Sequence, residues 1–348
     1  MKTIKVLVSL LTAVSVRKGT TLPIVFCVFV FLSCTSVVRS QGLTATLQKG
    51  DNMTAFYGVT AFKDAVTAAD DGAIITLSEG TFNTGTSAAP MEISKSITII
   101  GNGGIDISAK TTLEYLNITG NKVRVEGVSI NNVSLGEVTD VTFFRSYIVT
   151  IASAVSHVNT LVDQCKVKYD HAIELGKNYC IKNSVVENLS GSNSTSNLAY
   201  IENCIIFYFM LVNGNIAYIG PYAIYKNNII LIDSNYSSSN ILLNPSQAFN
   251  NIFTRSSSYC SLDIMKGNKF GISQVNIFGE VRSFSGSMGS MKVVDDTYKG
   301  EDGTPVGIFG GTGCSTTPTN PQITEKVIDS HTDKDGKINV KITVKAQP

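Results

Sequence analysis

The sequence predicts an all-β fold, a right-handed parallel β-helix (β-solenoid), on three observations. A six-residue pattern, represented by IENCII at residues 201–206, occurs eight times between residues 125 and 270. The third positions of these segments are 17 to 24 residues apart, with no helical segment in each unit. Only 16% of the residues are charged and 29 are glycines, which suits an all-β protein with an uncharged polar surface. A spacing of about twenty residues in short β-rich units is typical of a parallel β-solenoid.

Other repeat architectures fit this spacing less well. A leucine-rich repeat requires Leu and Asn at fixed offsets, and a propeller blade requires a unit of about twice this length. The uneven spacing favours a right-handed β-helix, whose turns tolerate insertions, over a strict hexapeptide helix. With 348 residues, the chain is long enough for one large domain or for two ordinary ones.

Residues 1–40 are predicted to be a signal peptide. Two apolar runs, at residues 6–16 and 22–38, follow Lys2 and Lys5, and the sequence VRS before Gln41 suits signal peptidase. A rival interpretation makes Cys34 a lipidated residue, which would attach the protein to the outer membrane, but the preceding FLS is a poor lipobox. An uncleaved membrane anchor fits less well, because the second run is short and is interrupted by Pro23. We therefore expect a secreted or cell-surface protein.

The β-helix is expected to occupy residues 41–272 and to begin with a cap. Residues 60–72 read as a short amphipathic helix with Thr60 as a candidate N-cap. Its apolar face would contain Phe62, Ala65, Val66 and Ala69. AIITLSEGTFN and ISKSITIIGNGG then have the period-two and glycine signals of the first coils.

Aligning the eight segments gives columns of residues that should stack from coil to coil. The sixth column is apolar throughout and is expected to face inward: Ile130, Ile148, Val167, Val186, Ile206, Ile230, Phe253 and Phe270. The fourth column holds mostly small or hydrogen-bonding residues at a bend: Val128, Ser146, Cys165, Ser184, Cys204, Asn228, Asn251 and Asn268. Asparagines in such a column can bond the equivalent residue one coil away. The third column, with Asn183, Asn203, Asn227 and Asn250, suggests a second ladder of this kind.

The period is lost after about residue 272, and residues 273–348 are predicted to form a small C-terminal β/loop region. Glycine-rich loops would cap the far end of the solenoid, and a hairpin would follow, with Ile338, Val340, Ile342 and Val344 alternating after the turn DKDG. Asp333 and Asp335 lack the further ligands of an EF-hand, so they are read as turn residues.

The helix followed by DGAIITLSEGTFN and EISKSITIIGNGG resembles the opening of pectate-lyase-like right-handed β-helix proteins. The resemblance extends from Gln41 to about Gly271, and with its tail the chain is similar to secreted bacterial β-helix proteins of unassigned activity, often linked with glycan-rich habitats. Characterised members include pectate lyases, polygalacturonases and pectin methylesterases as well as non-catalytic adhesins and tailspikes. The chain has neither the pectate-lyase arginine and calcium-carboxylate motif nor the NTD, DD, GHG and RIK series of polygalacturonases, so no catalytic residue is carried over.

The second column contains the candidate catalytic residues. Four consecutive coils alternate acid and base there, at Asp163, Lys182, Glu202 and Lys226. Such a cluster could abstract a proton or bind calcium. The favoured interpretation is a solvated ladder of cross-strand ion pairs, each contributing about 0.2–1 kcal/mol.

For the other residues that could take part in catalysis, metal binding or ligand binding, structural roles are favoured. Asp170 and His171 could form a general base, but a loop-facing polar pair is preferred. Cys165 and Cys204 share a column two coils apart, about 9–10 Å, which is too far for a disulfide, so they are expected to be buried packing residues. A group of aromatic residues could either form a platform for stacking sugars or pack in the core: Phe207, Tyr208, Phe209, Tyr218, Tyr222 and Tyr225.

The leading functional hypothesis is an exported bacterial, non-catalytic protein that binds glycans or other surface molecules, with a polysaccharide or a surface glycan as the expected partner. The alternatives are a uronate lyase or glycoside hydrolase, and a structural envelope component. The net charge of +1 gives no electrostatic case for nucleic acid as a partner. No spacing of Cys and His predicts a metal or another cofactor.

Overall fold

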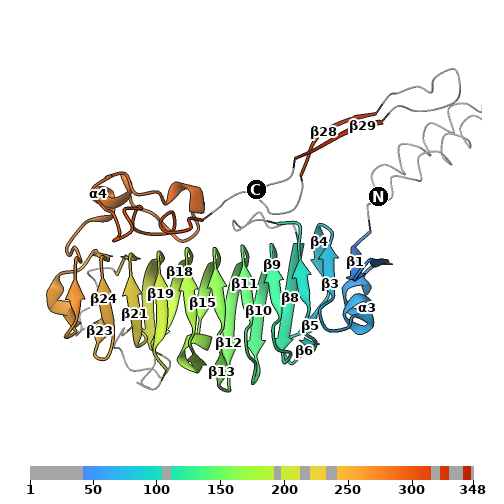
Figure 1. Ribbon diagram of the computed structural model, residues 1–348, viewed down its shortest axis with the longest axis horizontal. Helices are drawn as coiled ribbons and strands as arrows, with labels where there is room; N and C mark the ends of the chain where they lie inside the picture. The colour runs from blue at the N-terminus through green and yellow to red at the C-terminus, as the bar shows by residue number, and fades with distance from the viewer. Residues whose placement is uncertain are drawn as a thin grey trace, which may run out of the picture. The chain divides into compact units, whose positions relative to one another are not determined.

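The structure is a computed structural model that describes residues 42–103, 111–191, 197–211, 220–232, 241–314, 322–328 and 340–345. Successive coils of the chain contribute strands to two long, mostly parallel sheets, which makes the molecule a right-handed parallel β-helix (Figure 1). The predicted fold class is therefore confirmed. The proposed signal peptide and Cys34 lie outside the described residues. Within the described ranges, no helix combines the length and apolar character needed to span a bilayer.

Sheet A is the 12-stranded sheet, in which β1 (Thr44–Lys49) and β2 (Asn52–Tyr57) form an antiparallel edge. Its parallel strands, in order, are β3 (Ile74–Leu77), β7 (Thr98–Ile100), β9 (Arg124–Glu126), β11 (Thr142–Phe144), β14 (Leu161–Asp163), β17 (Cys180–Lys182), β19 (Ala199–Glu202), β21 (Ala223–Lys226), β24 (Gln247–Phe249) and β27 (Met265–Lys266).

Sheet B is the 11-stranded sheet that follows the bend of each coil. Its strands are β4 (Gly80–Phe82), β5 (Gly85–Thr86), β6 (Ala89–Ile93), β8 (Thr111–Ile118), β10 (Ser129–Leu135), β12 (Tyr147–Ser153), β15 (Lys166–Asp170), β18 (Val185–Gly191), β20 (Ile205–Leu211), β22 (Ile229–Ile230) and β25 (Ile252–Phe253). Two short parallel ladders lie between sheet B and the next strand of sheet A in the chain: β13 (His157–Val158) with β16 (Gly176–Lys177), and β23 (Leu242–Leu243) with β26 (Cys260–Ser261).

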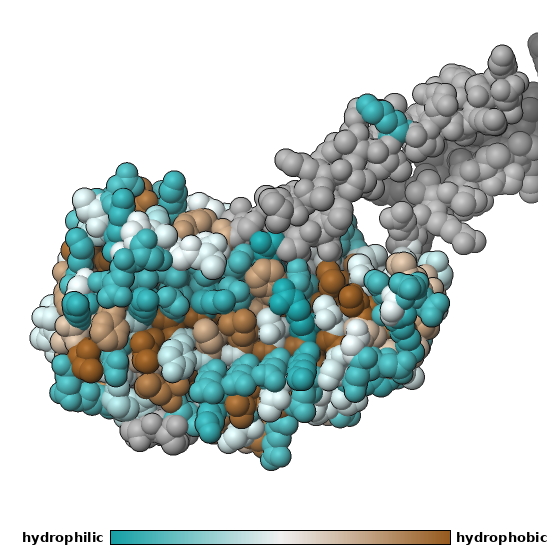
Figure 2. All heavy atoms as spheres, in the orientation of Figure 1, coloured by the Kyte–Doolittle hydropathy of each residue, from teal (hydrophilic) through white to brown (hydrophobic). Residues whose placement is uncertain are grey.

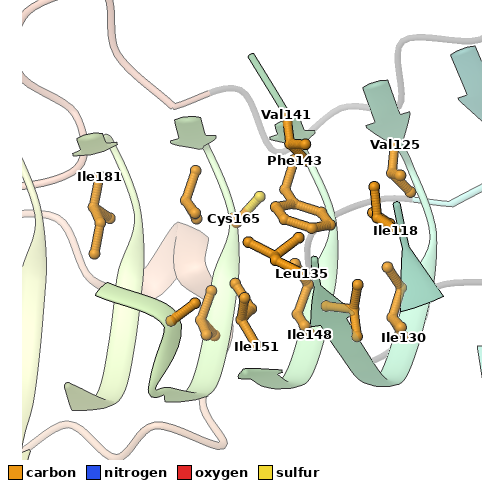
Figure 3. Packing of buried hydrophobic residues seen from close by; sticks show 14 of the residues in the cluster. Ile118, Val125, Ile130, Leu135, Val141, Phe143, Ile148, Ile151, Cys165 and Ile181 are labelled. Atoms are coloured by element: carbon orange, nitrogen blue, oxygen red, sulfur yellow. The ribbon is translucent and has the colours of Figure 1, made fainter. Parts of the chain in front are cut away.

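The sixth column lies in the core, as predicted. Ile130, Ile148 and Val167 pair in register across β10, β12 and β15, and each is fully buried. Figure 3 shows Ile130 and Ile148 of sheet B and Val125 and Phe143 of sheet A in the same interior. A single coil cannot bury its own apolar side chains, so this continuous column stabilises the stack as a whole.

The third column forms the bend between the two sheets. Its residues all have positive φ angles, from 46° to 73°: Gly127, Arg145, Gln164, Asn183, Asn203, Asn227, Asn250 and Gly267. Asparagine and glycine are favoured at such positions because they tolerate the left-handed conformation best. The predicted asparagine ladder of this column is wrong: Asn203 Oδ1, both side-chain polar atoms of Asn227 and Asn250 Nδ2 are buried without a hydrogen-bond partner among the described residues. Asn183 does not bond a neighbouring asparagine either. Its side-chain nitrogen instead donates to the carbonyls of Ile308 and Gly310 in the C-terminal region, at 3.1 and 2.7 Å.

The fourth column forms the predicted asparagine ladder. The side-chain nitrogen of Asn228 donates to Oδ1 of Asn251 at 3.0 Å, and that of Asn251 donates to Oδ1 of Asn268 at 2.9 Å. Each Oδ1 also accepts the backbone N–H of the preceding coil, as for Cys204 and Asn228 at 2.8 Å. Ser184 does the same for Cys165 at 2.9 Å. At the bend, side-chain oxygens of this column therefore accept the backbone N–H groups that have no backbone carbonyl as a partner there.

The N-terminal cap contains the predicted helix. Helix α3 spans Ala61–Ala68, and Phe62, Ala65 and Val66 are buried as expected. Thr60 occupies the N-cap position, but its side chain makes no capping hydrogen bond. At the other end, the Lys95 ammonium donates to three carbonyls, of Val66, Thr67 and Ala69, and so stabilises the negative end of the helix dipole.

The C-terminal segment, residues 273–314, packs along the outward face of sheet B. It contains α4 (Gln274–Phe278), whose Ile277 and Phe278 belong to a second apolar cluster with Val185, Ile205 and Ile229. In the view of Figure 2 the segment presents mainly hydrophilic residues, and hydrophobic residues gather in a band along the coils below it. Strands β28 (Gln322–Ile328) and β29 (Val340–Lys345) then form the predicted antiparallel hairpin, whose DKDG turn lies outside the described residues.

Candidate functional site

The four sequence-predicted site residues stand in one row on the outward face of sheet A. Asp163, Lys182, Glu202 and Lys226 are paired in register on β14, β17, β19 and β21. Asp163 Oδ2 lies 3.5 Å from Lys182 Nζ, and Glu202 Oε1 lies 3.7 Å from Lys226 Nζ. The structure therefore brings the residues together as two neighbouring ion pairs.

Asp163 is the least exposed member of this row. Burial raises the pKa of its carboxyl group, while the positive charges of Lys182, Arg124 and Arg145 oppose that rise. Its Oδ1 is buried and accepts no hydrogen bond from the described residues. Next to it, Arg124 and Arg145 lie over the ring of Phe144, at 4.5 and 5.0 Å from the centroid.

The geometry of the row is that of cross-strand ion pairs. The ammonium-bearing side chains of Lys182 and Lys226 are 34% and 39% exposed, so solvent and salt screen both pairs. In the part of the chain that the structure describes, no three His, Cys, Asp or Glu side chains are grouped as metal ligands. The arrangement is therefore that of a ladder along a sheet, with its charges spread over successive strands.

Asp170 and His171 do not form a pair. Asp170 points into the core of sheet B, where Tyr179 donates a hydrogen bond to its Oδ2 at 2.9 Å and burial raises its pKa to about 7. His171, the residue after β15, is partly exposed, stacks on Tyr169 and lies 2.5 Å from the Ser190 hydroxyl. The expected loop-facing pair is wrong, because Asp170 is fully buried in the core.

Sequence reasoning missed a buried polar cluster around Asp170. His157 is 1% exposed, with Nε2 at 2.9 Å from the Ala172 carbonyl and Nδ1 at 2.8 Å from the Thr160 hydroxyl. Its ring packs edge-on against Tyr179, at 5.6 Å between centroids. Asp170 pairs with Ile151 and Leu189 in the ladder, so an acid in an apolar column was the signal that could have revealed the cluster.

The cysteines and most of the aromatic candidates are packing residues. Cys165 and Cys204 are free and fully buried, as predicted, and burial raises the pKa of both thiols. Phe207, Phe209 and Tyr225 are also buried. Tyr218 lies outside the described residues, whereas Tyr208 and Tyr222 are partly exposed.

Tyr208 belongs to an outward polar column on sheet B that the sequence analysis did not identify. The column pairs one residue from each of six adjacent strands, all of them partly exposed: Tyr115, Asn132, Thr150, Tyr169, Asn188 and Tyr208. Five strand spacings give it a length of about 24 Å. The segments aligned on residues 125–270 end at the sixth position, so this column lay beyond the alignment.

The outward polar column leads to a cavity of about 450 Å³. The cavity is lined by Tyr208, Leu231, Ile232, Thr254, Arg255, Ser256, Tyr259 and Gln274. Arg255 is 6% exposed, and its guanidinium carbon lies 4.2 Å from the centroid of the Tyr259 ring. Because Gln274 comes from α4, the C-terminal segment forms one wall of the cavity. The cavity could not be recognised in the sequence, because α4 lies beyond the last repeat.

Comparisons with protein-family models, with curated proteins and with solved structures found no match to this chain. The function is therefore inferred from the geometry of its own residues.

Proposed function

We propose that this protein is an exported glycan-binding β-helix protein, and that it binds its ligand along the outward polar column of sheet B and in the adjoining cavity. The observation that carries the proposal is the continuity of the two. Six partly exposed Tyr, Asn and Thr side chains follow one another at strand spacing, and the last of them, Tyr208, also lines the cavity. A concave site with aromatic walls and a few polar groups is the usual form of a small-ligand site.

The side chains of the column suit sugars. Tyrosine offers an apolar ring face for stacking and a hydroxyl for hydrogen bonding, while the Asn amides and the Thr hydroxyl can both donate and accept. A ladder of backbone hydrogen bonds holds all six residues, so little conformational freedom would be lost on binding. The length of a pyranose ring is close to one strand spacing, which would let consecutive sugars meet consecutive coils.

The family and the location belong to the same proposal. The α3 cap and the two long parallel sheets support membership of the pectate-lyase-like superfamily that the first coils resemble. Residues 1–40 would direct export, and N-terminal sequencing of the mature protein should begin near Gln41. A mature terminus at a lipidated Cys34 would instead place the protein on the outer membrane.

A glycan array tests the binding function, with Tyr169→Ala as the informative variant. We expect oligosaccharide binding by the wild type and a loss of at least about fivefold in the variant, because truncating a central aromatic contact typically costs 1 kcal/mol or more. Tyr200→Ala is the matched control, since Tyr200 is 46% exposed on β19 of sheet A. Equal effects of the two substitutions, or no binding by the wild type, would reject the proposal.

One observation favours polysaccharide cleavage as a second candidate function. Asp163 combines a raised pKa with a buried carboxylate oxygen, which suits a general acid. A lyase acting on uronates would generate the ultraviolet absorbance of an unsaturated product. That signal should disappear in Lys182→Ala, whereas glycan binding to sheet B should not change.

A further inference from the structure

We propose that the edge strand β2 is a dimerisation surface, on which a second copy of this chain pairs its own β2 antiparallel about a two-fold axis at Ala55. The inference does not depend on the proposed glycan binding, because β2 belongs to sheet A, whereas the outward polar column lies on sheet B. Figure 1 shows β1, the neighbour of β2 in the sheet, beside α3 at the N-terminal end of the coils.

Strand β2 is a sheet edge without the usual protection. It has six residues, whereas β27, β25 and β5, the other end strands of the two long sheets, have two each. All six residues pair with β1 without a register shift, so no bulge twists the edge away. No proline and no charged residue occurs between Asp51 and Lys63. Proteins normally blunt an edge by one of these devices, so an edge with none of them is suited to pairing with another strand.

The open backbone groups of β2 belong to alternate residues. The Gly58 N–H donates to the Leu43 carbonyl at 2.8 Å, which makes these two residues a hydrogen-bonded pair at the end of the β1–β2 ladder. Hydrogen-bonded and non-hydrogen-bonded pairs alternate along an antiparallel ladder, so every second residue of β2 directs its N–H and carbonyl away from β1. Counting back from Gly58, these residues are Tyr57, Ala55 and Met53.

These three residues make the edge complementary to itself. In an antiparallel pairing about Ala55, the two copies of Ala55 face each other, and Met53 of each copy faces Tyr57 of the other. Each of these pairs joins residues whose open groups point at the partner, so each can exchange both N–H···O=C hydrogen bonds. Any other antiparallel register leaves at least one of the three residues opposite a residue whose groups do not point at it. The backbone therefore selects this register.

The exposed side chains match in the same register. Met53 and Tyr57 are 69% and 73% exposed, and both lie on one face of the strand, because side chains two residues apart point the same way. In the proposed pairing they become cross-strand neighbours, and a methionine sulfur beside an aromatic ring is a favourable contact. Ala55 at the axis has only a methyl group to place against its own copy. Dimerisation would thus cover the largest exposed apolar side chains of β2.

The charge distribution favours a second copy over a different protein as the occupant. Identical surfaces repel each other wherever a charged residue meets its own equivalent, and β2 has no charged residue. The nearest charge, Asp51, would lie opposite Val59, which is exposed and uncharged. An uncharged strand also offers nothing that would attract a strongly acidic or basic partner.

The size of the contact sets its strength. A strand of six residues is about 20 Å long, so two such edges bury less than the roughly 800 Å² per partner of a standard stable interface. We therefore expect a reversible dimer with a Kd in the micromolar range, on the order of 10 μM. Sedimentation velocity of the purified protein from about 1 to about 200 μM should show a shift from monomer to dimer across this range.

Charges placed at the axis test the geometry. Ala55→Lys sets two ammonium groups against each other and should weaken the dimer at least about tenfold, and Ala55→Glu should do the same with two carboxylates. An equal mixture of the two variants should restore the dimer, because each interface then contains one charge of each sign. Thr76→Lys is the matched control: Thr76 is exposed in the same row of sheet A, with Thr46 between it and Ala55, and this variant should dimerise like the wild type.

Circular dichroism and thermal melting should be the same for all four proteins, because β2 is an edge and Ala55 is exposed. The inference fails if the wild type stays monomeric at about 200 μM, or if Ala55→Lys dimerises as well as Thr76→Lys. It also fails if the mixture does not restore the dimer, since the axis then lies elsewhere. Assemblies larger than a dimer would show that the edge pairs without closing about a two-fold axis, which contradicts the proposal as well.

Discussion

At the scale of single residues, the bend between the two sheets is stabilised by side chains that replace backbone acceptors. Asn251 shows this most fully: it is 0% exposed, its Oδ1 accepts the N–H and the side-chain amide of Asn228, and its own amide donates to the Tyr225 carbonyl at 3.0 Å. Hydrogen bonds of this kind contribute little individually, but leaving a buried donor unpaired costs much more. The fourth column is therefore sensitive to truncation even though it contains no large side chain.

Replacing Asn251 with alanine should reduce the free energy of unfolding by about 3 kcal/mol, because it leaves buried N–H groups on Asn228 without acceptors. Urea denaturation followed by circular dichroism measures this change. Asn131→Ala, at an exposed position of β10, is the control and should change stability by less than about 0.5 kcal/mol. Equal losses in both variants would show that the ladder has no special role.

Asp170 gives a prediction about pH. Burial raises its folded pKa to about 7, whereas the unfolded carboxyl has a pKa near 3.8. Between these two values the folded protein holds more protons at this site than the unfolded chain, so the contribution of Asp170 lowers stability as pH rises. Burial lowers the pKa of His157 in the folded protein. The folded protein therefore binds fewer protons at His157 than the unfolded chain, so this residue lowers stability as pH falls through the unfolded pKa of 6.5.

Comparing the wild type with Asp170→Asn isolates the first effect. Asparagine keeps an acceptor for the Tyr179 hydroxyl but does not titrate, so the stability of the variant relative to the wild type should increase from pH 4 to pH 7. Chemical denaturation at several pH values measures the difference. A constant difference across this range would contradict a proton held by Asp170 in the folded state.

At the scale of elements, the outward side chains at the start of the sheet B strands explain where the C-terminal segment packs. Along this column, Ser129, Tyr147 and Lys166 give way to Val185 and then to isoleucine on the later strands. This column at the start of the strands is therefore polar in the early coils and apolar in the late ones. The C-terminal segment covers the apolar part, and Lys166 marks the boundary by donating to the Gly286 carbonyl at 2.8 Å.

Ile308→Ala should loosen the C-terminal segment while the coils stay folded. Ile308 is fully buried in the second apolar cluster, and truncating such a residue typically costs 2–5 kcal/mol. Hydrogen exchange should increase in residues 273–314 and stay unchanged in β10 and β12. Val281→Ala, at a residue that is 71% exposed, serves as the control. Faster exchange throughout the solenoid would instead mean that the segment and the coils unfold as one unit.

The elements that could be predicted are those whose identity depends on the repeat. Stacking forces equivalent residues into register, so the inward position of Ile148 and the charge row at Asp163 followed from alignment alone. The cavity could not be predicted, because Arg255 and Gln274 are brought together by packing between a late coil and a non-repetitive helix. The asparagines of the third column were predicted to form a hydrogen-bonded ladder, but they occur there because the bend requires a positive φ, which is 47° at Asn183. Asparagine suits both roles, so the residue type alone does not distinguish them.

At the scale of the whole molecule, stacked coils convert a local choice of residue into a long surface. Each coil contributes one side chain to the outward polar column, so the length of the proposed binding surface is set by the number of coils that keep a compatible residue there. The same reasoning applies to the ion pairs on sheet A, which extend over neighbouring strands without converging on one point.

The dependence of affinity on ligand length tests this distribution. Because the column is about 24 Å long, affinity should rise with each added sugar and then level off once the chain spans the six strands. Isothermal titration with oligosaccharides of two to eight units of one bound glycan measures the curve. Tyr115→Ala, at the end far from the cavity, should weaken only the longer ligands, whereas Tyr208→Ala should weaken all of them, since Tyr208 lies where the column meets the cavity. If a disaccharide binds as tightly as an octasaccharide, the cavity alone holds the ligand and the column is only a structural surface.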